Sequence, residues 1–292
     1  MSHLMIFGAG YSGKAIARAL QGKMDRISGT TRGEDNISTL QCLAIAPFIF
    51  DGETLNEDLR SELRGVIHLV QSIAPGASGD PLLRLCDGDL KSLMPQLQWA
   101  AYLSTVGVYG NHDGDWVDED TPCRPVSVRS KERVAAEEAW ETAATEAGVA
   151  LCVLRLSGIY GPGRNGLVNL DKGTARRLVK KDQVFNRIRV EDIGAATAFL
   201  IEKNASGIFN VTDDEPAPPQ DVVTFAADLM GVEPPEEQSF ETAELSNMAR
   251  SFYGENKRVS NSKLTELGFH FAYPDYRQSL RQLWQDEVWR DE

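Results

Sequence analysis

Short apolar runs alternate with amphipathic stretches along the first half of the chain. The runs that predict strands cover residues 4–7, 26–31, 48–50, 66–70, 99–104 and 150–156. The stretches with helical spacing cover residues 12–20, 89–97 and 127–147, and Gly148 gives the last of these a natural stop. Strands that alternate with helices predict an α/β fold with a doubly wound parallel sheet.

The alternation weakens after residue 157. Turn-forming residues gather at 161–166, and residues 213–219 combine three prolines with three acids. We therefore expect two domains. The sheet domain covers residues 1–157 and returns at about 187–211, and a smaller C-terminal domain covers residues 158–186 and 212–292.

The composition narrows the classes of partner. The formal net charge of −13 over 292 residues disfavours nucleic acid and anionic membranes. No apolar run approaches the length of a membrane span, and no secretory leader is recognised, so we expect a cytoplasmic protein. The four cysteines lack metal-ligand spacing, and we expect no metal site.

A glycine pattern follows the first predicted strand and opens the first predicted helix. It consists of Gly8, Gly10 and Gly13, with Tyr11 and Ser12 between the last two. In this context the first glycine permits a tight turn, the second permits close approach of a pyrophosphate, and the third permits helix–strand packing. The helix N-terminus then offers N–H groups to phosphates. The pattern predicts dinucleotide binding on a Rossmann-type domain, and a plain tight turn is the alternative.

The end of the second predicted strand indicates which dinucleotide binds. NAD-binding domains place an acid there to hold the ribose 2′-hydroxyl, but this chain has Thr31 and Arg32. An arginine can hold a 2′-phosphate, which favours NADP. Glu34 and Asp35 lie just beyond and keep NAD as the alternative, and a solvated surface arginine is the plain interpretation of Arg32.

Several ordered motifs resemble the extended short-chain dehydrogenase/reductases, the NAD-dependent epimerase/dehydratase family. Besides the glycine loop, they are residues 50–52 (FDG), 103–110 (LSTVGVYG), 118–122 (DEDTP), 155–163 (RLSGIYGPG) and 187–193 (RIRVEDI). The resemblance implies that the smaller domain binds a small-molecule substrate. It also implies that the nucleotide site includes Asp51, Gly52, Val70, Ser72 and Ser157.

The family's chemistry uses a Ser/Thr and a Tyr-x-x-x-Lys pair on the following helix, where a lysine lets the tyrosine act as a base. By position, Thr105 is the Ser/Thr, and Lys131 is the lysine that also holds the nicotinamide ribose. Ser127 occupies the tyrosine position, which resembles an atypical subgroup. Three interpretations stay open: another acid such as Tyr109 or Tyr160 substitutes, hydride transfer draws its proton from water or substrate, or no chemistry occurs.

The same resemblance places Tyr160, Arg164 and Arg187 at the substrate. The segment that follows Gly163 is short, which favours a smaller substrate than a nucleotide sugar. Its basic residues suggest an anionic or phosphorylated substrate, although a solvated face explains them equally well. These residues are Arg164, Arg176, Arg177, Lys180 and Lys181.

We therefore expect an NADP-binding oxidoreductase or epimerase-like enzyme that acts on a small carbonyl or sugar-derived substrate. The alternative is a catalytically silent NADP(H)-binding sensor. A homodimer through the helices near 89–97 and 127–147 is an arrangement that the resemblance allows.

Overall fold

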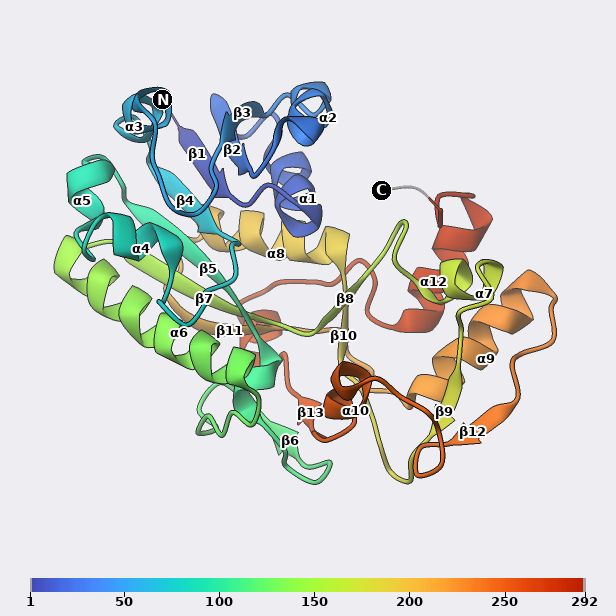
Figure 1. The fold of residues 1–292 in the computed structure, drawn as a ribbon. Coiled ribbons are helices and arrows are strands. Elements are labelled where there is room, and N and C mark those ends of the chain that lie inside the picture. The colour runs from blue at the N-terminus through green and yellow to red at the C-terminus, as the bar shows by residue number, and fades with distance from the viewer. Residues whose placement is uncertain (1, 291–292) are drawn as a thin grey trace. The chain divides into compact units, whose positions relative to one another are not determined.

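The computed structural model describes residues 2–290, except for the side chains of residues 247–249 (Figure 1). The chain forms two compact units. Unit 1 contains residues 1–108, 128–155 and 193–209, and unit 2 contains residues 109–127, 156–192 and 210–292.

A seven-stranded sheet forms the centre of the fold, in the order β11-β7-β5-β4-β1-β2-β3. The neighbouring pairs from β3 to β5 are parallel, as in a dinucleotide-binding fold with its change of direction between β1 and β4. The predicted α/β, doubly wound architecture is confirmed. The strands are β1 (His3–Phe7), β2 (Arg26–Thr31), β3 (Ala46–Ile49), β4 (His68–Gln71), β5 (Trp99–Thr105), β7 (Ala150–Leu156) and β11 (Gly207–Val211).

Helices of unit 1 cover both faces of this sheet (Figure 1). One face carries α4 (Pro81–Leu85), α5 (Leu90–Leu93) and α6 (Val128–Ala147). The other carries α1 (Tyr11–Leu20) and α8 (Val190–Glu202), which touch closely enough that a Cβ on Gly194 would lie 2.5 Å from the Ala15 carbonyl oxygen. The remaining helices are η1 (Glu34–Asn36), α2 (Ile37–Cys42), α3 (Glu57–Leu63) and η2 (Val106–Tyr109).

The helix predicted at 89–97 is wrong in length, because the chain forms only the single turn α5 there. Pro95 ends this helix, because the residue before a proline is disfavoured in the helical region and Met94 has a φ of −125° and a ψ of 73°. Two strands also lie about two residues from their predicted positions, since β3 starts at Ala46 and β4 starts at His68.

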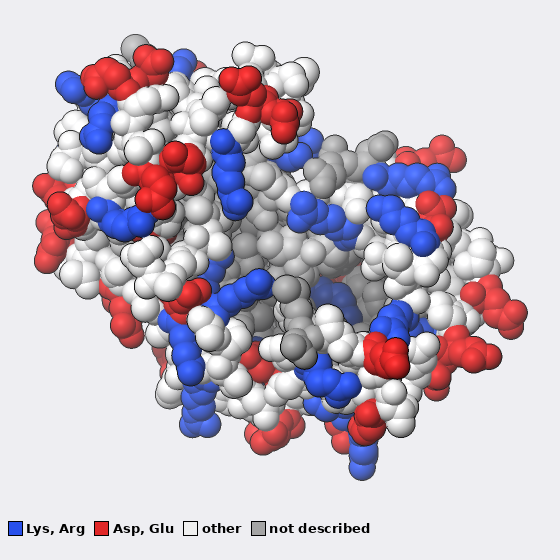
Figure 2. All heavy atoms as spheres, viewed as in Figure 1, with Lys and Arg blue, Asp and Glu red and all other residues white. Residues whose placement is uncertain are grey.

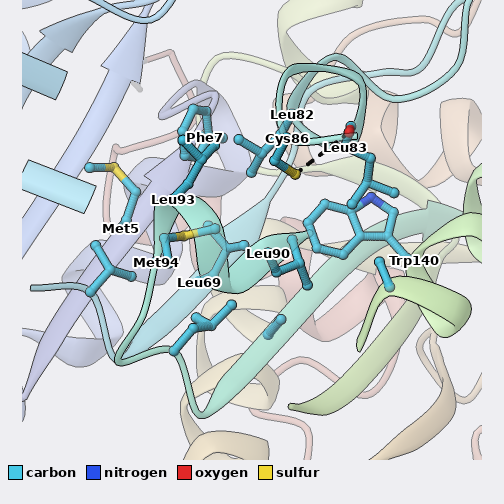
Figure 3. Close-up of a cluster of buried hydrophobic side chains, with 14 of the residues drawn as sticks. Met5, Phe7, Leu69, Leu82, Leu83, Cys86, Leu90, Leu93, Met94 and Trp140 are labelled. Atoms are coloured by element: carbon cyan, nitrogen blue, oxygen red, sulfur yellow. Dashed lines mark hydrogen bonds between the residues drawn. The ribbon is translucent and has the colours of Figure 1, made fainter. Parts of the chain in front are cut away.

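Figure 3 shows the apolar core between the sheet and the α4–α6 face. Met5 and Phe7 of β1, Leu69 of β4 and Leu90 of α5 contribute to it. Trp140 of α6 stacks on Tyr102, with ring centroids 6.1 Å apart. This packing fixes α6, and with it the segment that carries Lys131, against β5.

A buried ion pair fastens α6 to the sheet from within. Arg155 Nη2 of β7 donates to Glu137 Oε2 of α6 at 2.7 Å, and both side chains are less than a tenth exposed. The Ser104 hydroxyl of β5 donates to the other oxygen of the same carboxylate. One turn earlier in α6, Arg133 Nη1 donates to the Leu103 carbonyl oxygen at 2.5 Å. Polar contacts therefore hold the helix at the end of β5.

Unit 2 is built from short two-stranded pairs and helices. Its pairs are β8 (Gly158–Tyr160) with β10 (Arg187–Arg189), β9 (Arg177–Val179) with β12 (Glu237–Ser239), and β6 (Trp116–Val117) with β13 (Arg258–Val259). Its helices are α7 (Gly166–Asp171), α9 (Pro219–Met230), α10 (Asn247–Phe252), α11 (Ser262–Glu266) and α12 (Tyr276–Gln285). Leu167 of α7, Ala226 of α9 and Leu280 of α12 share a separate apolar core.

Charges of both signs are interspersed on the face shown in Figure 2. Within the described residues, no helix is long and apolar enough to cross a membrane. The same residues contain no cluster of three or more His, Cys, Asp or Glu side chains suited to a metal ion.

We predict that Glu137→Ala lowers the free energy of unfolding by about 3–5 kcal/mol, because it leaves the Arg155 charge buried without a partner. Urea titration followed by circular dichroism measures the effect. The matched control is Glu138→Ala, which removes the next, exposed carboxylate of the same helix and should change the free energy by no more than about 0.5 kcal/mol. Equal effects of the two substitutions would contradict the role given to the ion pair.

Candidate functional site

The glycine loop joins β1 to α1 at the carboxyl edge of the sheet. Gly8 has a φ of +83°, which only glycine adopts readily, and its N–H donates to Thr30 Oγ1 at 2.8 Å. Ala9 N–H donates to the Thr30 carbonyl oxygen at 2.9 Å, and Ser72 N–H donates to the Phe7 carbonyl oxygen at 2.9 Å. Bonds to β2 and to the segment after β4 therefore fix the turn.

Gly10 and Gly13 meet different surroundings. A Cβ on Gly13 would lie 2.9 Å from the Gly8 carbonyl oxygen, so this position needs glycine for packing. A Cβ on Gly10 would meet no described atom within 4 Å, and no described side chain caps the helix that Gly10 starts. The loop therefore leaves open space in front of the first N–H groups of α1, where Tyr11 and the buried Ser12 lie.

The neighbouring strand ends carry the other nucleotide-site candidates of unit 1. Thr31 ends β2, and Arg32 follows it as an exposed side chain. Asp51, also exposed, accepts the N–H groups of Glu53 at 2.8 Å and Thr54 at 3.0 Å through Oδ1. These two bonds, that of Glu53 first, lower the pKa of the Asp51 carboxyl. The turn through Gly52 thus presents a charged carboxylate beside the end of β2.

A buried network supports the segment after β4. Val70 is fully buried, and Ser72 is half-buried just beyond the strand. Gln71 Nε2 donates to both Asp80 carboxylate oxygens at 2.9 Å, and Asp80 also caps α4. Sequence reasoning missed this pair, although Asp80-Pro81 is the usual sign of a helix start and could have revealed α4.

The predicted catalytic residues Thr105 and Lys131 lie on two elements, at the end of β5 and at the start of α6. Thr105 ends β5, and its Oγ1 accepts the Gly107 N–H at 3.1 Å. A Cβ on Gly107 would lie 3.0 Å from Ser130 Oγ and 3.5 Å from Thr105 Oγ1, so the two side chains flank this glycine. Lys131, exposed, follows Ser130 in the first turn of α6. Sequence reasoning did not single out Ser130, whose only signal is its place before Lys131.

Ser127 precedes α6 by one residue, so the position of the family tyrosine lies at the very start of the helix. Tyr109, offered as a substitute acid, is fully buried and donates to Asn210 Oδ1 at 2.7 Å. Asn210 is held in turn by Glu119 and by the Ser260 carbonyl oxygen. This environment favours a packing role for Tyr109 over proton transfer.

The substrate candidates lie in unit 2. Tyr160 of β8 and Arg187 of β10 belong to paired strands, and Arg164 is exposed in the turn before α7. Burial raises the pKa of Tyr160, and the charge of Asp213 raises it further, so the phenol stays protonated as a donor. Ser157 is buried after β7, where its N–H donates to the Val211 carbonyl oxygen at 3.2 Å.

Three basic residues of the segment after Gly163 form hydrogen bonds with other groups of the protein. Arg177 Nη2 donates to Glu237 at 2.7 Å, Arg176 Nη1 donates to the Glu244 carbonyl oxygen at 2.9 Å, and Lys180 donates to Gln183 at 3.1 Å. The two arginine contacts join β9 and the residue before it to the segment around β12, and the Lys180 contact is local. They favour the structural interpretation of these residues over an anionic substrate site.

Comparisons with known proteins place the chain among relatives of matching length. A protein of Silicibacter pomeroyi, described as functionally unknown and conserved, is 42% identical, with a TM-score of 0.88 over 98% of this chain and 99% of that one. Protein YeeZ of Escherichia coli is 27% identical over 289 residues, which cover 94% of this chain and 97% of YeeZ. The dTDP-glucose 4,6-dehydratase of Bacillus anthracis, solved with NAD, shares only the fold, at 17% identity and a TM-score of 0.76 over 98% and 96% of the two chains.

The family model gives the broader assignment. The model of the NAD dependent epimerase/dehydratase family matches residues 4–212, from the first strand of the sheet to the residue after its last one. That match supports a nicotinamide dinucleotide as the cofactor and agrees with the geometry of the glycine loop. The chain belongs to the NAD-dependent epimerase/dehydratase family.

Proposed function

We propose that this protein is an NADP-preferring member of the family, an oxidoreductase or epimerase-like enzyme acting on a small carbonyl or sugar-derived substrate. The observation that carries the proposal is the glycine loop, fixed by bonds from within the protein and open in front of Gly10. That opening and the uncapped start of α1 fit a pyrophosphate, which needs close backbone approach and N–H donors.

Different residues of unit 1 would bind different parts of the dinucleotide. The α1 start, from Gly10 to Gly13, would take the pyrophosphate, and Asp51 would take the adenine side. Arg32 would take a 2′-phosphate, since it follows the strand end where an NAD enzyme carries an acid. The rest of the proposed nucleotide site in unit 1 consists of Gly8, Thr31, Gly52, Val70 and Ser72. Ser157, which the resemblance also assigns to the nucleotide, belongs to unit 2.

The reaction would use the two catalytic residues of the family that this chain retains, Thr105 and Lys131. A bound nicotinamide dinucleotide supplies hydride transfer. Thr105 would polarise a substrate carbonyl or hydroxyl through a hydrogen bond from its hydroxyl, and Lys131 would hold the nicotinamide ribose through its ammonium. Ser127 cannot replace tyrosine as a base, because an aliphatic hydroxyl is a far weaker acid than a phenol. A proton from water or substrate is then required.

The serine at position 127, where the family has a tyrosine, also favours a second candidate function. A protein that keeps the nucleotide loop but lacks the acid–base pair can act as an NADP(H)-binding sensor. In that case binding alone carries the signal, and the free energy of binding would stabilise one conformation over another.

We predict that Gly10→Ala leaves the melting temperature unchanged but weakens NADPH binding by about tenfold or more, because the new methyl group occupies the space needed by the pyrophosphate. Calorimetric titration and thermal unfolding measure the two effects. Gly8→Ala is the contrast, since its left-handed φ and the Ile73 side chain at 3.0 Å should make it lower stability as well. Normal NADPH binding by Gly10→Ala would contradict the proposed pyrophosphate site and favour the alternative that the glycine loop is a plain tight turn.

Replacement of Arg32 by alanine should weaken NADPH binding about 10- to 100-fold, as expected for loss of charge-assisted hydrogen bonds. NADH binding should change little. Titrations with both nucleotides give the comparison, and Arg18→Ala, an exposed arginine in the last turn of α1, serves as control. Equal losses for NADPH and NADH would refute the NADP preference.

Turnover separates the enzyme from the sensor. Oxidation of NADPH, followed by absorbance, should be seen with at least one of a panel of aldehydes, ketones and keto-sugars. It should fall about 100-fold or more in Thr105→Ala, which loses a hydrogen bond to the reacting oxygen in the transition state. The rate of NADPH oxidation should fall much less in Ser130→Ala, which removes the neighbouring hydroxyl. Tight NADPH binding without turnover of any compound would favour the sensor.

A further inference from the structure

The segment that follows β4 packs its backbone against the glycine loop. Ser72 N–H donates to the Phe7 carbonyl oxygen at 2.9 Å. A Cβ on Gly8 would lie 3.0 Å from Ile73 Cγ1 and 3.3 Å from the Ile73 backbone nitrogen. The position of residues 72 and 73 therefore sets the room that the turn at Gly8 has. Because close-packed interiors transmit displacement, a shift of this segment would reach the loop.

The Gln71 side chain folds back over this segment and holds it. Its Oε1 accepts the Ile73 N–H at 3.1 Å, and its Nε2 donates to both carboxylate oxygens of Asp80 at 2.9 Å. Gln71 is fully buried, so neither end of the amide can exchange its partner for water without cost. An ionised carboxylate only accepts hydrogen bonds, so Asp80 determines which end of the amide faces Ile73.

Asp80 is a buried carboxylate that several donors approach. Its Oδ1 accepts the N–H groups of Leu82 at 2.9 Å and Leu83 at 3.1 Å, at the start of α4. The Trp140 indole of α6 donates a further hydrogen bond to it. Burial raises the pKa of the Asp80 carboxyl, and its hydrogen bonds, that from Gln71 first, oppose this rise. These donors favour the charged form, which has no proton of its own to offer Gln71.

Capping of α4 does not by itself account for the burial of Asp80. Asp89 caps α5 in the same way, through the N–H groups of Lys91 at 3.1 Å and Ser92 at 3.2 Å, and it does so as an exposed side chain. Asp80 is only 3% exposed. Burial of a carboxylate costs free energy, and a cap at the surface avoids that cost. The contact with Gln71 is what the buried position adds.

We propose that Gln71 and Asp80 are positioning residues of the nucleotide site. The Asp80 carboxylate orients the Gln71 amide, and the amide holds residues 72 and 73 against the glycine loop in the shape that a nicotinamide dinucleotide requires. Both side chains act through the backbone of this segment. The inference rests on the proposed function, because it concerns the same nucleotide site.

The chemistry of the pair permits a swap that keeps its shape. In the double variant Gln71→Glu/Asp80→Asn, the carboxylate at position 71 would accept the Ile73 N–H and an N–H of the new amide, whose oxygen would accept the α4 N–H groups. Gln71→Glu alone places two carboxylates against each other. Asp80→Asn alone turns the Gln71 amide over and sets its Nε2 donor against the Ile73 N–H.

The first test measures NADPH affinity by calorimetric titration, at a temperature where each variant is folded. Each single variant should weaken NADPH binding about tenfold or more, as for loss of a hydrogen bond to a charged group. The double variant should recover an affinity within about threefold of the wild type, since the two positions are coupled. The matched control Asp89→Asn makes the same substitution at the exposed cap of α5 and should leave NADPH affinity unchanged.

The second test follows amide hydrogen exchange by NMR without nucleotide, and a role limited to capping α4 would not change its result. Gln71→Met keeps a buried side chain of similar length and should fold. It should raise the exchange rate of the Ile73 amide about tenfold or more, because that N–H loses its acceptor. The amides of Leu82 and Leu83 keep Asp80 as acceptor and should change little. NADPH binding should weaken in parallel, by about tenfold.

The proposal is overturned if the folded single variants bind NADPH normally, if the double variant does not recover affinity, or if Gln71→Met leaves the Ile73 amide protected. If the single variants do not fold, the double variant and Gln71→Met decide. Weak NADPH binding by Gly10→Ala together with normal binding by Gln71→Met would support the nucleotide site and overturn this proposal alone. A wild-type protein that binds no nicotinamide dinucleotide would overturn both.

Discussion

Close packing of α1 against its surroundings is the constraint on which the nucleotide half of the molecule depends. Side chains are excluded at two contacts of this helix. A Cβ on Gly13 would meet the Gly8 carbonyl oxygen, and one on Gly194 would meet the Ala15 backbone. The loop before the helix packs as closely, because a Cβ on Gly29 of β2 would lie 2.8 Å from Ala9 Cβ. This approach brings the start of α1 level with the ends of β1 and β2, where the candidate residues gather.

Much of unit 1 could be predicted from the sequence because its signals are local. The first strand, the glycine loop and α1 are contiguous, and each glycine has a reason that spacing alone suggests. The helix predicted at 89–97 is too long because its apolar periodicity continues past Pro95. The proline forces Met94 out of the helical region and ends the helix at Leu93.

The features of unit 2 depend on contacts between distant segments, and the sequence gives little sign of them. Arg176 and Arg177 meet partners some sixty positions away, so a run of basic residues suggested an anion site that the fold fills itself. Asp213 stood only as one acid in a proline-rich turn. Its position beside Arg187 is set by the hydrogen bond from its backbone N–H to the Arg187 carbonyl oxygen, which forms as the chain folds. No pattern along the sequence indicates this contact.

The bonds that fix the glycine loop have a thermodynamic consequence. Gly8 and Ala9 are tied to Thr30, and Ser72 is tied to Phe7, through hydrogen bonds inside the protein. The conformational entropy of ordering this turn is therefore lost when the chain folds and not when a nucleotide arrives. Differences in affinity between two nucleotides should then reflect the contacts that each one makes, with little contribution from reshaping the loop.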